Sequence, residues 1–416
     1  MLVVNLLIFL LTMIYLLYRS NKAVKSGDMV GFLLNPLLYF VFFGLLYLIF
    51  SNILVSLGAF NILPTGLPEN INLKTHSSIY TTLFFVSLLF CYIFSKDIKG
   101  LQFSLLKYKP YNEFFLNFIV VMIFLLMTYI LISHYKVLLS LRGDRASVYG
   151  YFANDIYKPY KLGVVVNVYS AVLIFLSLSK NKMSRFIVLL PFLIFALLDF
   201  LQGGRSIIIR LIVILYIIFA IKKNKLYIYQ SFVCFVVLSI VFVWERLSSS
   251  SGLAALFTVF GEFIFTRLTV DYVLYYNLHG DWYTALLKYV LSVFPGKLNG
   301  YFLEDEIGYA ELISNYSGLS WGLAGNIVSE ALFYFGNGFI FSIVFVMLTC
   351  LVHYNRYTIM TMPFFIINII YISNIQNIFR ASVFEFGLVM LYLSISYLFL
   401  FSFLFFRKRS LSKRLV

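Results

Sequence analysis

The stretch that decides the fold is Phe186–Leu201 (FIVLLPFLIFALLDFL), followed by Gln202-Gly203-Gly204-Arg205-Ser206 and then by Ile207–Ile221 (IIIRLIVILYIIFAI). Each apolar run approaches the roughly 20 residues that cross a bilayer, and only a short glycine-containing segment separates the two. This pattern predicts a helical hairpin whose turn holds Arg205 at a membrane surface. An arginine in that place is a candidate site for an anionic ligand.

The whole chain has the composition of a polytopic membrane protein. Of its 416 residues, 62% are hydrophobic and 12% are charged, which is more apolar side chain than a soluble globule could bury. The runs are continuous and do not alternate, so an all-α fold is predicted and not a barrel. Eleven spans are expected, at Leu2–Tyr18, Phe32–Leu57, Ile79–Ser95, Phe114–Ser133, Leu162–Leu178, Phe186–Leu201, Ser206–Ile221, Leu226–Trp244, Leu319–Cys350, Tyr357–Ser373 and Ser382–Phe406. The first is expected to be retained, because no basic region precedes it and no small-residue cleavage site follows it.

The basic residues orient these spans. If the N-terminus is outside, nineteen of the 32 basic residues lie on the cytoplasmic side, together with only three acidic residues, Asp28, Asp97 and Glu113. The positive-inside rule therefore predicts an N-out, C-in topology. The net charge of +15 comes from the basic residues expected on the cytoplasmic side, so it gives no reason to expect a nucleic-acid partner. The prediction is one integral membrane domain, 1–416, with long external connections at 134–161 and 245–318, the larger holding short interfacial helices.

Neither a cofactor nor a metal is expected. The three cysteines lie apart in predicted spans, and the short cytoplasmic connections contain no nucleotide-binding fingerprint. The acidic run Glu304–Glu306 has the oxygen ligands that a divalent ion prefers, but a solvated loop is the favoured explanation.

Three arginines stand on the external side, each at the end of an expected helix: Arg205, Arg267 and Arg380. Arg210 lies about 7.5 Å deeper than Arg205 if the helix is regular. Guanidinium groups suit a diphosphate because they stay charged and donate paired hydrogen bonds. The simpler alternative for Arg210 is an ion pair with an intramembrane acid, Asp199 or Glu330.

The larger external connection contains the most concentrated charged motif. Arg267 and Asp271 stand at i and i+4, so a helix would place them on one face, and the simpler alternative is a helix-surface ion pair between them. The preceding apolar run, Leu253–Phe265, is too short to cross and should lie along or dip into the interface, with Arg267 at headgroup height. Trp282–Phe294 is a second short amphipathic stretch.

Two further motifs follow. Glu330 is expected about 15 Å inside the helix that begins at Leu319, where a carboxylate must be paired, protonated or solvated. Asn374–Arg380 is a polar stretch that is predicted to be an external connection before the last span.

In order and sidedness these features resemble the bacterial O-antigen polymerases, the Wzy-type oligosaccharide repeat-unit polymerases. The residues that carry the resemblance across essentially the whole chain are Gly203-Gly204-Arg205-Ser206, Arg267, Pro295-Gly296-Lys297, Gly325, Glu330, Gly336 and Arg380. Members share about 11 or 12 spans, as span counting also gives here, and two large external loops with essential arginines. The chain departs from the family in its first loop, where Arg142 and Arg145 do not reproduce the usual spacing from a glycine.

The resemblance implies a GT-C-like, metal-independent glycosyltransferase of lipopolysaccharide biosynthesis in the bacterial inner membrane, with its active site facing the periplasm. The donor would be the growing polysaccharide on undecaprenyl diphosphate, and the acceptor a single repeat unit on the same lipid. Membrane lipids and a chain-length regulator protein are the other expected partners. Arg205, Arg267 and Arg380, helped by Arg210, would stabilise the leaving diphosphate. The candidate bases are Glu330, Asp271 and His279, and the other candidate substrate-binding residues are Arg142, Arg145, Tyr272 and Trp321.

Two alternatives remain open from the sequence. An O-antigen ligase uses the same donor, and a catalytic histidine in the larger external connection, such as His279, would favour it. A lipid-linked oligosaccharide flippase would have two similar halves and short connections on both faces, which the long 245–318 connection disfavours.

Overall fold

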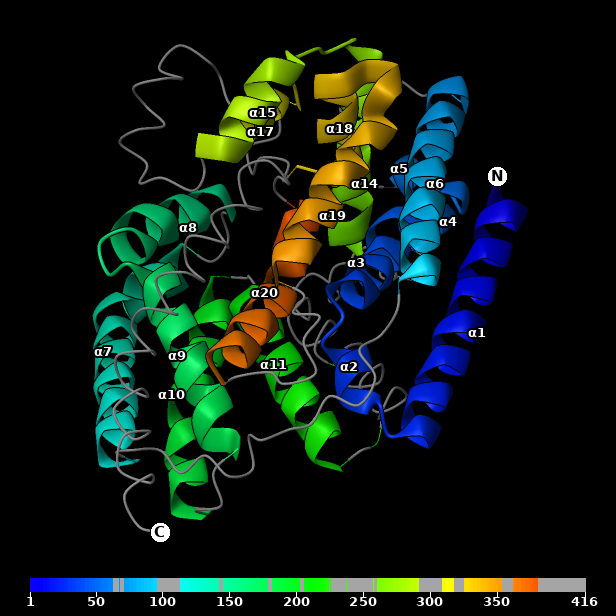
Figure 1. Ribbon diagram of the computed structural model, residues 1–416. Helices are drawn as coiled ribbons and strands as arrows, with labels where there is room; N and C mark the ends of the chain where they lie inside the picture. The colour runs from blue at the N-terminus through cyan, green and yellow to red at the C-terminus, as the bar shows by residue number, and fades with distance from the viewer. Residues whose placement is uncertain are drawn as a thin grey trace. The chain divides into compact units, whose positions relative to one another are not determined.

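The computed structural model describes residues 1–62, 71–95, 113–141, 145–178, 182–202, 206–223, 260–291, 309–317, 325–353 and 362–380, and the single residues 67, 225, 237 and 257. All regular secondary structure in these residues is helical (Figure 1), which confirms the predicted class. Five of the described helices are long and apolar enough to cross a membrane, or six if the bent pair Ser147–Tyr157 and Leu162–Ser177 forms one span. The chain is therefore a helical membrane protein.

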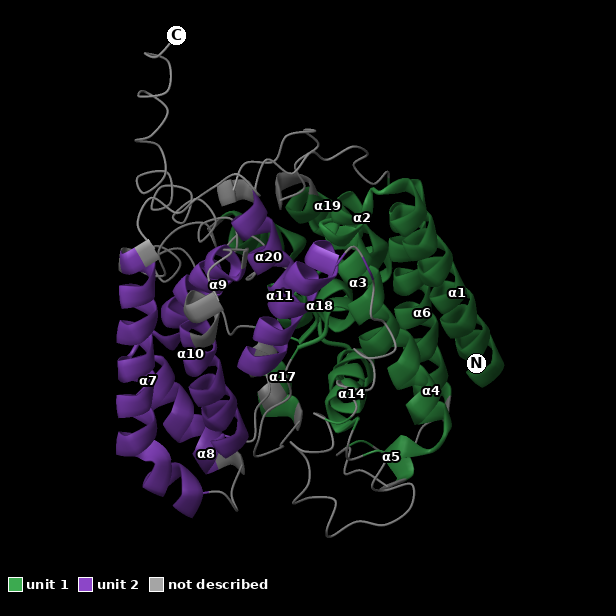
Figure 2. Ribbon diagram, turned by 90° about the horizontal axis from the view of Figure 1, so that it is seen from below, with its two compact units in different colours: residues 1–99, 226–354, 374–392 green, residues 100–225, 355–373, 393–416 purple. Residues whose placement is uncertain are grey.

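The chain divides into two compact units, which Figure 2 colours separately. Unit 1 comprises residues 1–99, 226–354 and 374–392, and unit 2 comprises residues 100–225, 355–373 and 393–416. Unit 1 therefore combines the N-terminal helices with the connection that was expected to be external.

Unit 1 is built around one span, Pro36–Ser56, that is assembled from three consecutive elements. Its helices are α1 (Leu2–Ser26), α2 (Met29–Leu33), α3 (Pro36–Gly44), η1 (Leu45–Phe50), α4 (Ser51–Ser56), α5 (Ala59–Ile62), α6 (Ile71–Phe94), α14 (Gly261–Tyr275), α15 (Trp282–Leu291), α17 (Tyr309–Ser317), α18 (Ile327–Phe335), η4 (Gly336–Phe341) and α19 (Ser342–His353). The α14 helix packs against η1, α4, α6 and α18, so a short helix from the large connection is enclosed by the spans.

The α1 helix shows the inverted polarity of a lipid-facing span. Val3 and Ile14 are 74% and 62% exposed, whereas Asn5, Thr12 and Ser20 are buried. The Asn5 side-chain oxygen accepts a 2.9 Å hydrogen bond from the Thr82 hydroxyl of α6. Apolar side chains gain nothing by leaving lipid, so polar contacts and close packing hold such helices together.

The start of the second span is encoded locally. Gly27 ends α1 in the left-handed region, at φ 74°, and its N–H bonds back to the carbonyl oxygens of Ala23 and Val24. Asn35 then caps α3, its side chain accepting from the Leu37 N–H at 3.1 Å, and Pro36 occupies the first helical position, where its missing N–H costs nothing.

Unit 2 centres on α10, which packs against α7, α9 and α11. Its helices are α7 (Glu113–Ser140), α8 (Arg145–Tyr151), η3 (Phe152–Tyr157), α9 (Leu162–Leu178), α10 (Lys182–Leu201) and α11 (Ser206–Lys223). Helix α20 (Met362–Arg380) contributes its residues through Ser373 to unit 2 and its last residues to unit 1. The two predicted helices on either side of the glycine-containing segment are confirmed as α10 and α11, which pack against each other.

Several predicted boundaries are wrong. The α7 helix continues to Ser140 and α8 begins at Arg145, so the 134–161 connection is mostly helical. The expected helix from Leu319 begins only at Ile327, because Asn326 accepts a hydrogen bond from the Val328 N–H and so caps α18. The spans expected at 226–244 and 382–406 lie outside the described residues.

Candidate functional site

The α14 helix carries a fully buried ion pair. Arg267 Nη1 lies 2.6 Å from Asp271 Oδ2, and the two side chains are 0% and 2% exposed. The prediction that both residues share one helical face is confirmed. The predicted alternative, an ion pair on the surface of the helix, is wrong, because the pair is buried and its partners come from α4 and α6. A charge in such a place is stable only when it is paired and hydrogen-bonded.

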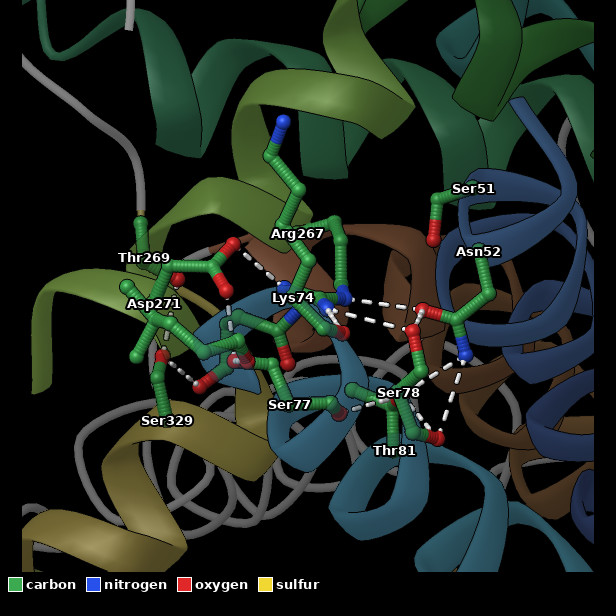
Figure 3. A network of polar contacts seen from close by, with 12 residues as sticks. Ser51, Asn52, Lys74, Ser77, Ser78, Thr81, Arg267, Thr269, Asp271 and Ser329 are labelled. Carbon is green, nitrogen blue, oxygen red and sulfur yellow. Dashed lines mark hydrogen bonds and ion pairs between the residues drawn. The ribbon is translucent and has the colours of Figure 1, made fainter. Parts of the chain in front are cut away.

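The Arg267 guanidinium is held by two neighbouring helices (Figure 3). Its Nε donates to Asn52 Oδ1 at 2.8 Å, and Nη2 donates to the Lys74 carbonyl oxygen at 3.3 Å and to Ser78 Oγ at 3.5 Å. Asn52 in turn donates to Thr81 Oγ1 at 2.8 Å. The guanidinium is therefore enclosed by bonds to α4 and α6, and it reaches no solvent.

Asp271 is held on its other oxygen by α6. The Ser77 hydroxyl donates to Asp271 Oδ1 at 2.5 Å, while Oδ2 faces Arg267. Both carboxylate oxygens thus have donors, which is what a buried carboxylate needs to stay ionised.

A second charged pair lies at the beginning of α14. Arg380 Nε lies 2.9 Å from Glu262 Oε1, and these side chains are 22% and 14% exposed. The Tyr47 hydroxyl of η1 also donates to Glu262 Oε1, at 2.6 Å, and the Gln376 amide donates to the Tyr47 oxygen at 3.1 Å. Unlike Arg267, Arg380 keeps part of its side chain accessible.

This pair corrects the prediction for Asn374–Arg380. The stretch was expected to be an external connection, but it forms the last turns of α20. Asn374, Gln376 and Phe379 are buried there. Polar side chains were mistaken for a loop because they face other polar groups inside the bundle, which composition alone does not reveal.

The two charged pairs lie at different depths along the second span. Asn52, beside Arg267, stands four residues before its end at Ser56, about 6 Å at helical rise, whereas Tyr47, beside Glu262, stands about 13 Å before that end. Helix α14 therefore runs from the interior of the span toward its end. Figure 1 places α15 and α17, which follow it, at the same end of unit 1 as the N-terminus.

A network of hydroxyl groups joins α14 to α17 and α18. The hydroxyl groups of Thr269 and Ser329 lie 2.8 Å apart, and Tyr309 also bonds to Ser329. Burial raises the pKa of the Tyr309 phenol, so its hydroxyl remains protonated. Glu330, the next residue, is 1% exposed. It lies in the first turn of α18 and not about 15 Å along a longer helix, so its predicted position in the helix is wrong although its burial was expected.

In unit 2 the residues around the glycine turn are held firmly. Asp199 accepts hydrogen bonds from the Gln202 amide at 2.5 Å and from the Ile208 N–H at 2.7 Å, so it ties α10 to the start of α11. Arg210 donates to Asn167 Oδ1 of α9 at 3.1 Å. Gly203, Gly204 and Arg205 themselves lie outside the described residues.

The remaining predicted site residues belong to neither charged pair. His279 is exposed and bonds to Asn277 Oδ1 at 2.9 Å. Tyr272 is buried, and its ring stacks on Tyr276 at 5.9 Å. Arg145 begins α8, but the structure does not describe its side chain. Arg142, Trp321, Pro295-Gly296-Lys297 and the acidic run 304–306 lie outside the described residues. Within the described ranges, no cluster of three or more His, Cys, Asp or Glu side chains could hold a metal.

The polar residues that surround Arg267 were not predicted from the sequence. They are Asn52, Lys74, Ser77, Ser78 and Thr81, which belong to α4 and α6, far before α14 in the sequence. One signal was present: Ser77 and Thr81, and Ser78 and Thr82, are spaced i and i+4 within an apolar span. Such spacing puts hydroxyl groups on one face, where they bond to another helix.

The chain matches no protein-family model, and comparisons with curated proteins and with solved structures give no match either. The site combines an enclosed arginine that joins three helices with a more accessible arginine that faces a carboxylate.

Proposed function

We propose that this protein polymerises undecaprenyl-diphosphate-linked oligosaccharide repeat units, in the manner of the O-antigen polymerases that its sequence resembles. The observation that carries the proposal is the partly exposed Glu262–Arg380 pair at the inner end of α14. A cation at this depth, between apolar spans, suits an anionic group attached to a membrane lipid. Positive charge there would stabilise a diphosphate as it leaves.

The proposed reaction is a glycosyl transfer between two lipid-linked saccharides. A hydroxyl oxygen of the acceptor forms a bond to the reducing-end anomeric carbon of the donor, and the bond from that carbon to the diphosphate oxygen breaks. Undecaprenyl diphosphate leaves with the electron pair, and a base takes the hydroxyl proton. Glu330 and His279 are the candidate bases, whereas both oxygens of Asp271 are occupied by Ser77 and Arg267. Neither a metal nor a cofactor is required by this scheme.

The arginines take different roles in this proposal. Arg380 would face the diphosphate, and the roles expected for Arg205 and Arg210 stay predictions from the sequence. Arg267 is a positioning residue, because its guanidinium is occupied by Asn52, Asp271 and α6. It holds α14 against the second span and so places Glu262.

The wider topology belongs to the same proposal. It comprises eleven spans in an N-out, C-in arrangement, a GT-C-like architecture in the bacterial inner membrane, and an active site that faces the periplasm. The partners would be the two lipid-linked substrates, membrane lipids and a chain-length regulator.

Deleting the gene tests the reaction. In a cell that attaches the polymer to lipopolysaccharide, we expect the ladder of long chains to collapse to a single repeat unit, because the units are still made, exported and ligated. Silver-stained gels of lipopolysaccharide measure this, and a plasmid copy should restore the ladder. Lipopolysaccharide with a bare core would instead contradict polymerisation and favour the ligase or the flippase.

One observation keeps the ligase as a second candidate: His279 is exposed in the connection where a ligase would need its histidine. The deletion experiment separates the two activities, because loss of a ligase leaves no repeat unit on the core.

Arg205 offers a separate test of the diphosphate site. Replacing Arg205 with alanine should reduce polymer yield by about 10²-fold, the usual effect of removing one transition-state donor. Arg205→Lys should retain part of the activity, since it keeps the charge but not the paired hydrogen bonds. The measurement is ladder intensity at equal protein abundance, with the exposed Lys223→Ala variant as control. A complete ladder from Arg205→Ala would assign this residue a structural role only.

A further inference from the structure

A cluster of exposed tyrosines stands at the end of α14, away from the charged pairs. Tyr275, Tyr276 and Tyr316 are 44%, 38% and 47% exposed. The Tyr276 ring lies 4.9 Å from both the Tyr275 ring, which is perpendicular to it, and the tilted Tyr316 ring. These three residues form what we call the tyrosine surface. Its rings come from two helices and contact one another while they remain open to solvent.

The backbone beneath the tyrosine surface is held in place. Asn277 adopts a left-handed conformation, at φ 50°, which turns the chain directly after Tyr276. The Gly280 N–H then donates to the Phe333 carbonyl oxygen of α18 at 2.8 Å. A Cβ at Gly280 would lie 2.2 Å from the Phe333 ring, so this close approach requires glycine. The turn is thus fastened to the bundle.

Tyr316 is fixed in a similar way. It stands seven residues after Tyr309, two helical turns along α17 and on nearly the same face. Tyr309 is buried and bonds to Ser329 of α18. Both contributing helices are therefore anchored, so a ligand on the tyrosine surface would not need to order it first.

The polar residues near these tyrosines suit a saccharide. Asn277, His279 and Asn315 are exposed beside them in the chain. A sugar ring presents an apolar C–H face and a rim of hydroxyl groups, so it can pack on an aromatic ring and bond to amide, imidazole and phenol groups around it. Tyrosine provides a rigid amphipathic contact at low cost in conformational entropy.

A membrane-interface role fits α15 better than the tyrosine surface. On α15, Trp282, Leu286 and Val290 are exposed at i, i+4 and i+8, which makes a continuous apolar stripe of the kind that lies on lipid. The exposed residues beside Tyr276 and Tyr316 are polar instead. Trp282 is therefore a matched control for the tyrosines.

We propose that Tyr275, Tyr276 and Tyr316 bind a sugar ring of the oligosaccharide. That this oligosaccharide is part of a lipid-linked substrate rests on the proposed function. Binding of a saccharide to the tyrosine surface does not depend on that function. From Glu262 to Tyr276 the chain rises about 20 Å along the helix. A substrate with its diphosphate near Arg380 would need to extend its glycan over about this distance to reach the tyrosine surface.

Binding of a soluble saccharide tests this site directly. The probe is the reducing oligosaccharide that mild acid releases from the lipid-linked pool of the native cells, added to the purified full-length protein in lipid nanodiscs. Saturation-transfer NMR and titration measure contact and Kd. We expect Tyr276→Ala and Tyr316→Ala each to weaken binding about tenfold, which corresponds to about 1.4 kcal/mol of aromatic contact. Tyr276→Phe should retain most of the affinity, and Trp282→Ala all of it.

Three results would overturn the proposal. They are the absence of wild-type binding up to millimolar saccharide, an unchanged Kd in the Tyr276→Ala/Tyr316→Ala double variant, and an equal loss in Trp282→Ala, which would indicate a lipid interface. Equal unfolding temperatures show that the variants are folded. The gene deletion separates this proposal from polymerisation: tyrosine-dependent binding with an unaltered ladder in the deletion strain would keep the site and reject the polymerase.

Discussion

Replacing Arg267 with alanine is expected to destabilise the protein by about 3–5 kcal/mol, because the buried Asp271 carboxylate loses its counter-ion. The same change leaves Asn52 without the donor that now lies 2.8 Å from its side-chain oxygen. Asp271→Ala should have a comparable effect, since it leaves the guanidinium buried and unpaired. The measurements are thermal unfolding in detergent and abundance in isolated membranes.

A double variant separates the effect of losing one buried charge from the effect of losing side-chain packing. Arg267→Met/Asp271→Leu removes both charges at similar volume and should recover most of the lost stability. We also expect it to support polymer formation, because the Arg267 guanidinium reaches no solvent and acts by holding α14. Lys22→Ala, at an exposed position, should change stability by less than about 0.5 kcal/mol. Wild-type stability in Arg267→Ala would contradict the buried network, and a stable but inactive double variant would assign Arg267 to the ligand.

Replacing Arg380 with alanine is expected to act on activity more than on stability. The Glu262–Arg380 pair is less deeply buried than Arg267–Asp271, so its loss should cost less than the about 3–5 kcal/mol expected for that pair. Loss of a positive charge at the proposed diphosphate should lower polymer formation about 10²-fold to 10³-fold. The polymer yield of Arg380→Lys should lie between those of the wild type and Arg380→Ala, because a lysine retains the charge but not the planar pair of donors. The assay is polymer yield from purified lipid-linked repeat units at equal enzyme concentration.

The double variant Glu262→Gln/Arg380→Gln distinguishes an arginine that binds the diphosphate from one that only forms a structural ion pair. If Arg380 only neutralises Glu262, removing both charges should restore the polymer. We expect the double variant to remain inactive. Tyr47→Phe is the structural control, since it removes the hydrogen bond to Glu262 and leaves Arg380 in place. Wild-type polymer from the double variant would refute the role proposed for Arg380.

Local features of the site were predictable from the sequence. The spacing of Arg267 and Asp271 places them on one face of any helix, and the structure confirms both the helix and the ion pair. The hairpin of α10 and α11 also follows directly from two apolar runs around a glycine turn. These properties depend on residues a few positions apart, whose geometry helical periodicity determines.

The partners of those residues were not predictable. Asn52 and Ser77, which bond to Arg267 and Asp271, lie 215 and 194 residues from them in the sequence. The same limit explains the error at Asn374–Arg380, where polar side chains were interpreted as a loop although they bond inside a helical bundle. A polar residue in a membrane protein is stable wherever it finds a partner, so polarity alone does not distinguish a surface from an interior.

The sequence by itself determined that this protein is helical and embedded in a membrane. Its residues are 62% hydrophobic and lie in long continuous runs, and inside a bilayer such runs can form their backbone hydrogen bonds only as helices. It also placed Arg267, Asp271 and Arg380 among the residues that need an explanation. Only the tertiary structure decided that Arg267 is enclosed and Arg380 partly accessible. That difference depends on which distant helices contact α14, and neither composition nor periodicity encodes those contacts.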